Sequence, residues 1–135
     1  MLRMKSYKLS FATINILRND IAEFIINAGI EVNLTQVREA DEFLISHLQA
    51  PFSLMFNKLN NYSYSFEAQM KMGDIKQLNA IAIVSYSATS DLSTDALKFA
   101  IPRDKEWNLK RFSDKPHALE WLKQEQENLK TGKNH

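Results

Sequence analysis

A length of 135 residues suits one domain, and 44% hydrophobic with 24% charged residues is the composition of a globular protein, not of a disordered or membrane-embedded one. Seventeen Lys and Arg residues against sixteen Asp and Glu residues leave a formal net charge of +1, too balanced for the basic surface of a nucleic-acid-binding protein. The lack of cysteine excludes disulfide scaffolds, thiolate metal sites and thiol nucleophiles, and it agrees with a cytoplasmic location.

The N-terminal segment predicts an antiparallel hairpin. Apolar and polar residues alternate from Tyr7 to Leu17, the pattern of a half-buried strand. Arg18-Asn19-Asp20 supplies polar turn residues, and an apolar, β-branched pattern resumes from Ile21 to Ile26. We therefore expect one strand in each apolar stretch and a tight turn between them.

After the hairpin, the spacing of apolar residues changes from that of a strand to that of a helix. Apolar residues recur at spacings of three and four and predict one buried helical face, formed by Val37, Ala40, Leu44 and Leu48. The helix is expected to begin near Leu34, with Asn33 as its N-cap. After Pro51, the stretch from Phe52 to Phe56 has apolar residues on both faces and predicts a central strand.

The second half of the chain continues the alternation of helix and strand. Ala68, Met72 and Ile75 indicate a second helix, which Gly73 weakens because glycine is unfavourable inside helices. Ala80 to Val84 is a continuous apolar run and predicts a strand buried on both faces of a parallel sheet.

Three further elements are expected toward the C-terminus. They are a helix from about Asp91 to Phe99, a strand from Trp107 to Phe112 and a helix from Pro116 to Leu129. The inner face of the last helix is expected to consist of Ala118, Leu119 and Leu122.

The order of these elements predicts the fold class. We expect an α/β fold with a mixed sheet of about five strands, an antiparallel N-terminal hairpin followed by parallel βαβ units, flanked by about four helices. The chain is interpreted as a single domain over residues 1–135, with residues 1–6 and 130–135 frayed.

The sequence contains no familiar catalytic motif. There is no G-x-S-x-G elbow, H-E-x-x-H motif, Walker loop or G-x-G-x-x-G turn, and three glycines are too few for a phosphate cradle. The three histidines are widely separated, so neither a metal nor a cofactor is expected. Glu39, Asp41 and Glu42 are assigned to a solvated helix face, because no partner group suggests an acid–base pair.

Two polar loops, Asn57 to Ser65 and Ser85 to Asp91, follow the expected parallel strands. Because parallel strands end at one edge of a sheet, we expect these loops to lie side by side there. Capping of helices by Ser65 and Ser93 is the alternative to a role in recognition. The expected recognition surface consists of Asn57, Lys58, Asn60, Tyr64, Ser85, Tyr86 and Ser87.

The hairpin, the helix from Leu34 and the strand Phe52 to Phe56 resemble the STAS domain of anti-sigma-factor antagonists, as do Ile81 to Val84 and Trp107-Asn108-Leu109. The likeness is closest to the small SpoIIAA-like and Sec14-like proteins of bacteria. It implies a mixed sheet flanked by helices, no cofactor, and a role in protein–protein switching or in binding a nucleotide or lipid.

Regulators of this family carry an Asp-Ser pair in which the serine is phosphorylated. The resemblance makes Ser65 the first candidate for that serine and Ser63 the second, although Tyr64 stands where the aspartate would precede Ser65. Phosphopeptide mapping would test either assignment.

Two functions lead the interpretation of the sequence. The first is a non-enzymatic regulatory or protein-interaction module whose partner is another protein. The alternative is a carrier of a lipid or nucleotide, with Met55, Met70 and Met72 lining an apolar pocket. An enzyme is the third hypothesis, with Lys58, Ser65 and Ser85 as the residues to mutate first. No apolar run approaches the ~18 residues of a membrane span, so stable membrane insertion is not expected.

Overall fold

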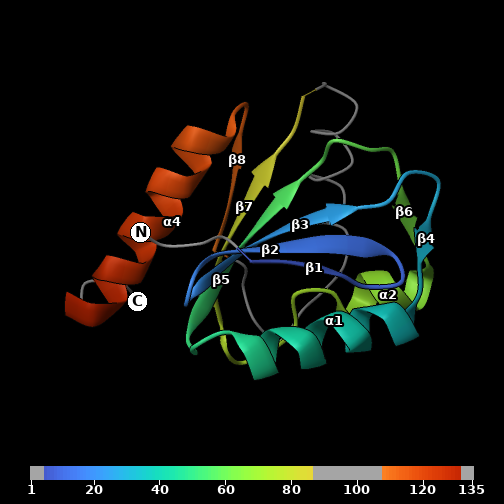
Figure 1. Cartoon of the computed structure of the whole chain (residues 1–135), viewed down its shortest axis with the longest axis horizontal. Coiled ribbons are helices and arrows are strands. Elements are labelled where there is room, and N and C mark those ends of the chain that lie inside the picture. Colours follow the sequence, from blue (N-terminus) through green and yellow to red (C-terminus); the bar gives the residue numbers. More distant parts are fainter. Residues whose placement is uncertain (1–4, 87–107, 132–135) are drawn as a thin grey trace.

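The structure is a computed structural model that describes residues 5–86 and 108–131, in which helices cover both faces of a sheet (Figure 1). The strands of the main sheet are β1 Lys5–Lys8, β2 Ala12–Arg18, β3 Ile21–Ile26, β5 Phe52–Asn57, β7 Leu78–Val84 and β8 Leu109–Phe112. The described helices are α1 Leu34–His47, α2 Phe66–Lys71 and α4 Lys115–Thr131. A small separate sheet pairs β4 Glu31–Val32 with β6 Ser63–Tyr64.

The topology confirms the predicted fold class. The main sheet has six strands in the order β1-β2-β3-β5-β7-β8. The first three strands pair antiparallel, and β3, β5, β7 and β8 run parallel to one another. As expected, β5 is central, between β3 and β7. The helix expected from Asp91 to Phe99 lies outside the described residues.

The N-terminal stretch forms two strands where the sequence predicted one, which raises the strand count from five to six. The chain reverses between β1 and β2, and the Leu9 N–H donates to the Ala12 carbonyl over 2.8 Å. Phe11 and Ala12 are both buried, so the strict alternation of a single strand is broken at the turn. No glycine, proline or asparagine marks this turn in the sequence.

Residues expected to be frayed at both ends are partly ordered. Lys5 and Ser6 belong to β1, because they pair with Ile16 and Asn15 of β2. At the other end, α4 extends to Thr131. Lys130 lies in its last turn, where a positive charge is favoured by the helix dipole.

The start of α1 agrees with the sequence prediction, whereas the end of α2 does not. Asn33 is the N-cap of α1: its side chain accepts from the Gln36 N–H over 2.9 Å, and Gln36 returns a bond to the Asn33 N–H. The α2 helix ends at Lys71, earlier than expected, because Gly73 adopts a positive φ of 74° and Ile75 therefore lies beyond the helix.

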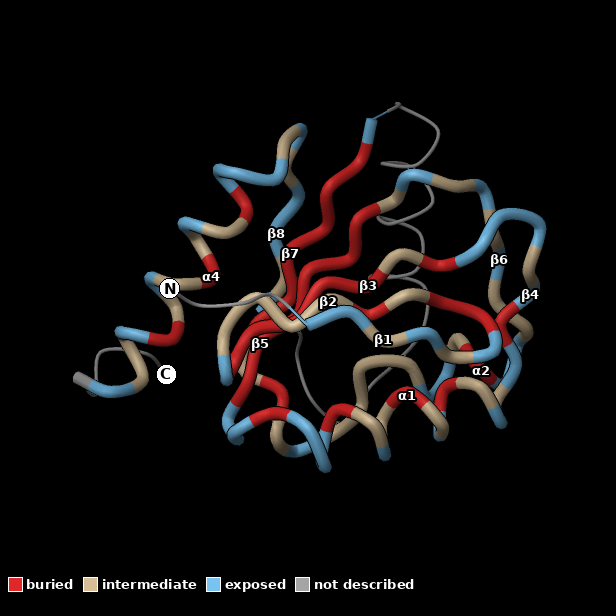
Figure 2. The backbone as a smooth tube through the Cα atoms, viewed as in Figure 1, coloured by how far each residue is buried: buried red, intermediate tan, exposed pale blue. Residues whose placement is uncertain are grey.

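The core has one apolar layer on each face of the sheet (Figure 2). Alternate residues of β7 supply both layers: Ile81 and Ile83 face α1, while Ala80 and Ala82 face α4. The small alanines allow α4 to pack closely on β7 through its buried Ala118 and Leu122. In the part of the chain that is described, no helix is long and apolar enough to cross a membrane.

Candidate functional site

The two polar loops begin side by side at the carboxyl edge of the sheet. Strands β5 and β7 are parallel neighbours, with Asn57 opposite Val84. The Lys58 N–H donates to the Val84 carbonyl over 2.9 Å, and the Tyr86 hydroxyl donates to Asn57 Oδ1 over 2.8 Å. The expected proximity is therefore confirmed as far as Tyr86, whereas Ser87 to Asp91 and the expected cap Ser93 lie outside the described residues.

Only part of the expected recognition surface is accessible. Tyr86 is 52% exposed, and Lys58 and Asn60 are partly exposed. Asn57 and Ser85 are buried, contrary to the expected surface position, because Asn57 is the last residue of β5 and Ser85 directly follows β7. The buried Asn57 amide is satisfied by hydrogen bonds inside the molecule, as buried polar groups require.

Tyr64 packs against the core, whereas the sequence led us to expect an exposed side chain. Its ring lies edge-on to that of Tyr62, with centroids 5.6 Å apart, and it contacts the apolar layer below α1. Burial, the neighbouring Tyr62 phenol and its hydrogen bond raise the pKa of Tyr64 well above the ordinary value. Tyr64 is therefore a neutral packing residue at physiological pH.

Ser65 and Ser63 occupy different environments. Ser65 is the N-cap of α2, and its hydroxyl oxygen accepts from the Ala68 N–H over 3.1 Å, which confirms the capping role. Ser63 is exposed in β6. Phosphorylation of either serine stays a prediction.

Glu23 was missed by the sequence interpretation. Its side chain is fully buried in β3, where Oε1 accepts from Asn15 over 3.0 Å and Oε2 accepts from Asn57 and Lys115 over 2.8 and 3.0 Å. Burial raises the pKa of Glu23, but the three donors together outweigh burial and hold it below the ordinary value. The carboxylate is therefore ionised at neutral pH. One charged residue within the apolar run Ile21–Ile26 was the available signal.

We expect Lys115→Met to lower the free energy of unfolding at pH 7 by about 1–3 kcal/mol, because Glu23 would lose its counterion and keep only amide donors. Folding lowers the pKa of Glu23, so its contribution is present above the ordinary value of 4.5 and is lost as the pH falls through the folded value. Urea unfolding at pH 7 and at a series of pH values below 4.5 measures both effects. An equal loss in the exposed control Lys71→Met would contradict this assignment.

A second buried network attaches the C-terminal half of α4 to the sheet. The Gln126 side-chain oxygen accepts hydrogen bonds from the Ser53 hydroxyl and the Asn79 amide. The Gln126 side-chain nitrogen donates to Asp20 and to the Pro51 carbonyl, and both of these bonds measure 2.9 Å. All four hydrogen-bonding positions of this amide are used. The network therefore fixes the position of α4.

A polar cleft of about 350 Å³ adjoins this network. Its buried carboxylate, Asp20, accepts two bonds from the Arg18 guanidinium in addition to the bond from Gln126. Since these donors already occupy the carboxylate, the cleft offers no unsatisfied buried charge to a ligand.

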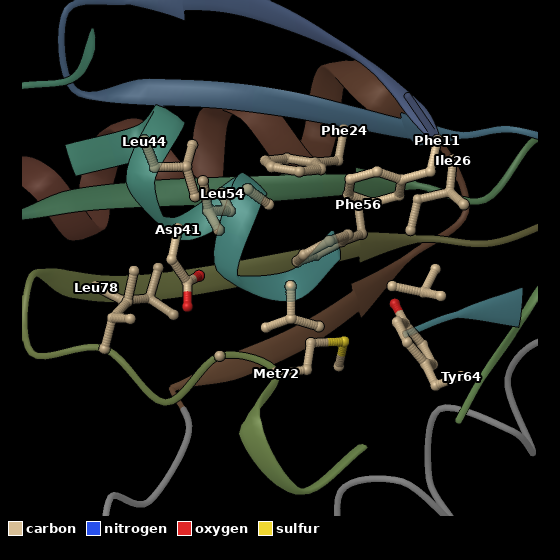
Figure 3. A pocket seen from close by; sticks show the side chains of 15 residues that line it. Phe11, Phe24, Ile26, Asp41, Leu44, Leu54, Phe56, Tyr64, Met72 and Leu78 are labelled. Carbon is tan, nitrogen blue, oxygen red and sulfur yellow. The ribbon is translucent and has the colours of Figure 1, made fainter. Parts of the chain in front are cut away.

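An apolar cavity of about 40 Å³ lies between α1 and the sheet (Figure 3). Phe24, Leu54 and Phe56 supply the sheet side of its wall, and Leu44 supplies part of the helix side. Asp41 is the charged residue of the lining.

Asp41 occupies a core-facing position of α1, so its assignment to a solvated helix face was wrong. It lies four residues after Val37 and three before Leu44, which places all three on one helical face. Figure 3 shows its carboxyl group among the apolar side chains of the cavity. That apolar spacing was the signal in the sequence, whereas Glu42 is exposed as expected.

Within the described residues, no hydrogen-bond donor and no cation offsets the burial of the Asp41 carboxyl group. Across residues 5–86 and 108–131, neither a hydrogen bond nor an ion pair reaches its side-chain oxygens. Burial, together with the negative charge of Asp74, raises the pKa of Asp41 from its ordinary 3.8 to about 6. At neutral pH the protein thus holds a poorly solvated negative charge beside an apolar cavity.

The three methionines expected to share a pocket are separated by the fold. Met72 lines the cavity, but Met55 lies on the opposite face of the sheet, below α4. Met70 is exposed on α2. The pocket expected from these residues is therefore not assembled.

The chain resembles a solved protein structure in its fold. No family model matches the chain, and no curated protein matches it. A superposition with a TM-score of 0.49 and 12% sequence identity covers 89% of this chain and 92% of the other. The chain is thus similar to an uncharacterized protein of the DUF3478 family from Shewanella loihica PV-4, described as having a SpoIIAA-like fold.

Proposed function

We propose that this chain is a regulatory module that binds another protein and catalyses no reaction of its own. The observation that supports this most is the exposure of two large apolar side chains on α2: Phe66 is 68% exposed and Met70 is 45% exposed. Residues four apart share one face of a helix, so the two side chains project together. Apolar groups presented in this way favour contact with a protein surface.

Two other segments, at the carboxyl edge of the sheet, carry exposed apolar side chains. Leu59, in the segment after β5, is 58% exposed, and Tyr86, just after β7, is 52% exposed. The hydrogen bond from Tyr86 to Asn57 holds the phenol in one orientation, which reduces the entropy lost when a partner covers the ring. We assign Phe66 and Met70 to the binding surface.

The alternative of a lipid or nucleotide carrier has less support. The apolar cavity of about 40 Å³ is smaller than the cavity of about 150 Å³ that holds a benzene molecule in an engineered protein. A lipid chain or a nucleotide is larger than benzene. Either ligand would require the core below α1 to open.

Regulation of the contact is proposed at Ser65, on the basis of the family resemblance. Ser65 immediately precedes Phe66, so a phosphate would bring about −1.5 to −2 charges next to the exposed ring. Such a charge would disfavour an apolar partner. Phosphopeptide mapping from the native cell tests this step, and lack of modification at Ser63 and Ser65 under all growth states would refute it.

The double variant Phe66→Ser/Met70→Ser is expected to weaken partner binding at least ~10-fold, because central apolar anchors carry most of the binding energy in protein interfaces. Both side chains are exposed, so thermal stability should change by no more than about 0.5–1 kcal/mol. The partner is first captured from the native cell with the wild-type chain, and binding is then measured with the two purified proteins.

Ile45→Ser is the matched control, since Ile45 is 48% exposed on α1 and outside the assigned surface. Its binding should equal that of the wild type. Equal binding by the double variant and the wild type would rule out α2 as the contact.

A further inference from the structure

The cavity below α1 has its charge at the mouth and its apolar wall inside. Asp41 is partly exposed, so its carboxyl group reaches solvent, whereas Leu44, Leu54 and Leu78 are buried. Figure 3 shows the Asp41 carboxyl group beside Leu44, Leu54 and Leu78 of the cavity wall. A ligand of matching chemistry carries a polar group at one end and a small apolar group at the other.

The charge at the mouth selects the polar group. Asp41 lines the cavity and the negative charge of Asp74 acts on it, so an anionic ligand would add a further negative charge. The Asp41 oxygens receive no donor within the described residues, so the ligand must donate hydrogen bonds. A primary ammonium group meets both requirements, with one positive charge and three N–H donors.

A metal ion does not fit the same position. Hard cations such as Ca²⁺ and Mg²⁺ take about six or more oxygen ligands, whereas the cavity wall offers one carboxyl group and the Tyr64 hydroxyl among apolar side chains. Among the residues that the structure describes, no three acidic or histidine side chains form a metal-binding group.

The volume limits the apolar part of the ligand. About 40 Å³ exceeds the roughly 10–15 Å³ that one water requires and falls well short of the about 150 Å³ of a benzene-binding cavity. A chain of two to four carbons is the corresponding size. A lysine side chain from a partner would bring its charge to Asp41 from the solvent side and leave the apolar part of the cavity unfilled, so a free amine suits the cavity better.

We infer that this cavity is a binding site for a small primary alkylamine, with the ammonium group on Asp41 and the alkyl group between α1 and the sheet. The site is separate from the exposed surface of α2. It therefore adds a small-molecule ligand to the proposed function of protein binding.

The test is a titration of the purified full-length chain with n-propylammonium chloride at pH 7.5, followed by the ¹³C-methyl NMR signals of Leu44, Leu54 and Leu78. Saturable shifts with a dissociation constant of about 1 mM are expected for a ligand of this size. 1-Propanol lacks the charge, propionate reverses it and ammonium chloride lacks the alkyl chain, so each should bind at least ~10-fold more weakly at equal ionic strength.

Asp41→Asn should weaken propylammonium binding at least ~10-fold, and Asp74→Asn should weaken it by a smaller factor. Glu42→Gln removes the same charge from the exposed face of α1 and should bind as the wild type does. Equal affinity for propylammonium and 1-propanol, unchanged affinity in Asp41→Asn, or lack of saturable shifts would each overturn the inference. No protein partner is present in the test, so its failure leaves the proposed protein contact standing.

Discussion

Ile83→Asp is expected to lower the free energy of unfolding by about 4 kcal/mol or more. Ile83 is buried in β7, between β5 and β8, and its side chain faces the apolar layer below α1. The substitution removes buried methyl groups and places a carboxylate where the apolar neighbours offer it no counterion. A loss of this size would remove most of the stability of a domain near the lower end of the usual range of about 5–15 kcal/mol.

Thermal and urea unfolding of the wild type and the variant measure this effect. Ile45→Asp makes the same chemical change at an exposed position of α1 and should alter stability by about 0.5–1 kcal/mol at most. If Ile83→Asp melted with the wild-type midpoint, β7 could not be the buried centre of the sheet.

Elements whose pattern repeats locally were predicted well from the sequence. The buried face of α1 follows from apolar residues at spacings of three and four, and β7 follows from five consecutive apolar residues. Such a pattern indicates which side of a helix or strand is buried, and a short stretch of sequence is enough to show it. The parallel order of β5 and β7 then follows from right-handed crossovers.

Features that depend on distant parts of the chain were not predicted. The two-residue strands β4 and β6 pair with each other across about thirty residues of sequence, and neither is long enough to show a pattern. The local turn between β1 and β2 was missed for another reason, because Ser10 is its one typical turn residue and apolar residues flank it.

The residues of the candidate sites likewise divide into those whose position could be predicted from the sequence and those whose position depends on distant contacts. The predicted strand order correctly placed Asn57 near Tyr86. It could not show that Asn57 is buried and donates a hydrogen bond to Glu23, which lies 34 residues away in the sequence. Glu23 and Asp41 each interrupt an apolar pattern, and pattern matching tolerates one such exception. Both exceptions are carboxyl groups whose surroundings alter their pKa values. A charged residue within an apolar pattern therefore marked a perturbed ionisable group at each of these two positions.

Asp41→Asn is expected to raise the free energy of unfolding by about 1–2 kcal/mol at pH 8. The pKa of Asp41 is about 6 in the folded protein and 3.8 ordinarily, a difference of about two pKa units at about 1.4 kcal/mol each, which solvent screening reduces because the side chain is partly exposed. Because folding raises this pKa, the stability that the protonated carboxyl group provides is complete below about pH 4 and is lost as the pH rises through about 6. Asparagine has nearly the same shape and does not titrate, so the variant avoids that loss.

The decisive measurement is the difference in unfolding free energy between Asp41→Asn and the wild type from pH 4 to pH 8. The difference should be close to zero at pH 4 and rise to its full value by about pH 7. Tyr64, the other titratable residue of the cavity wall, stays neutral over this range because its pKa is raised, so it does not contribute. Asp74→Asn removes the neighbouring negative charge and should give a smaller rise over the same range, whereas the exposed control Glu42→Gln should give none. A difference that stays constant with pH would mean that asparagine changes only the packing below α1, and that the Asp41 carboxylate is solvated rather than held against the cavity.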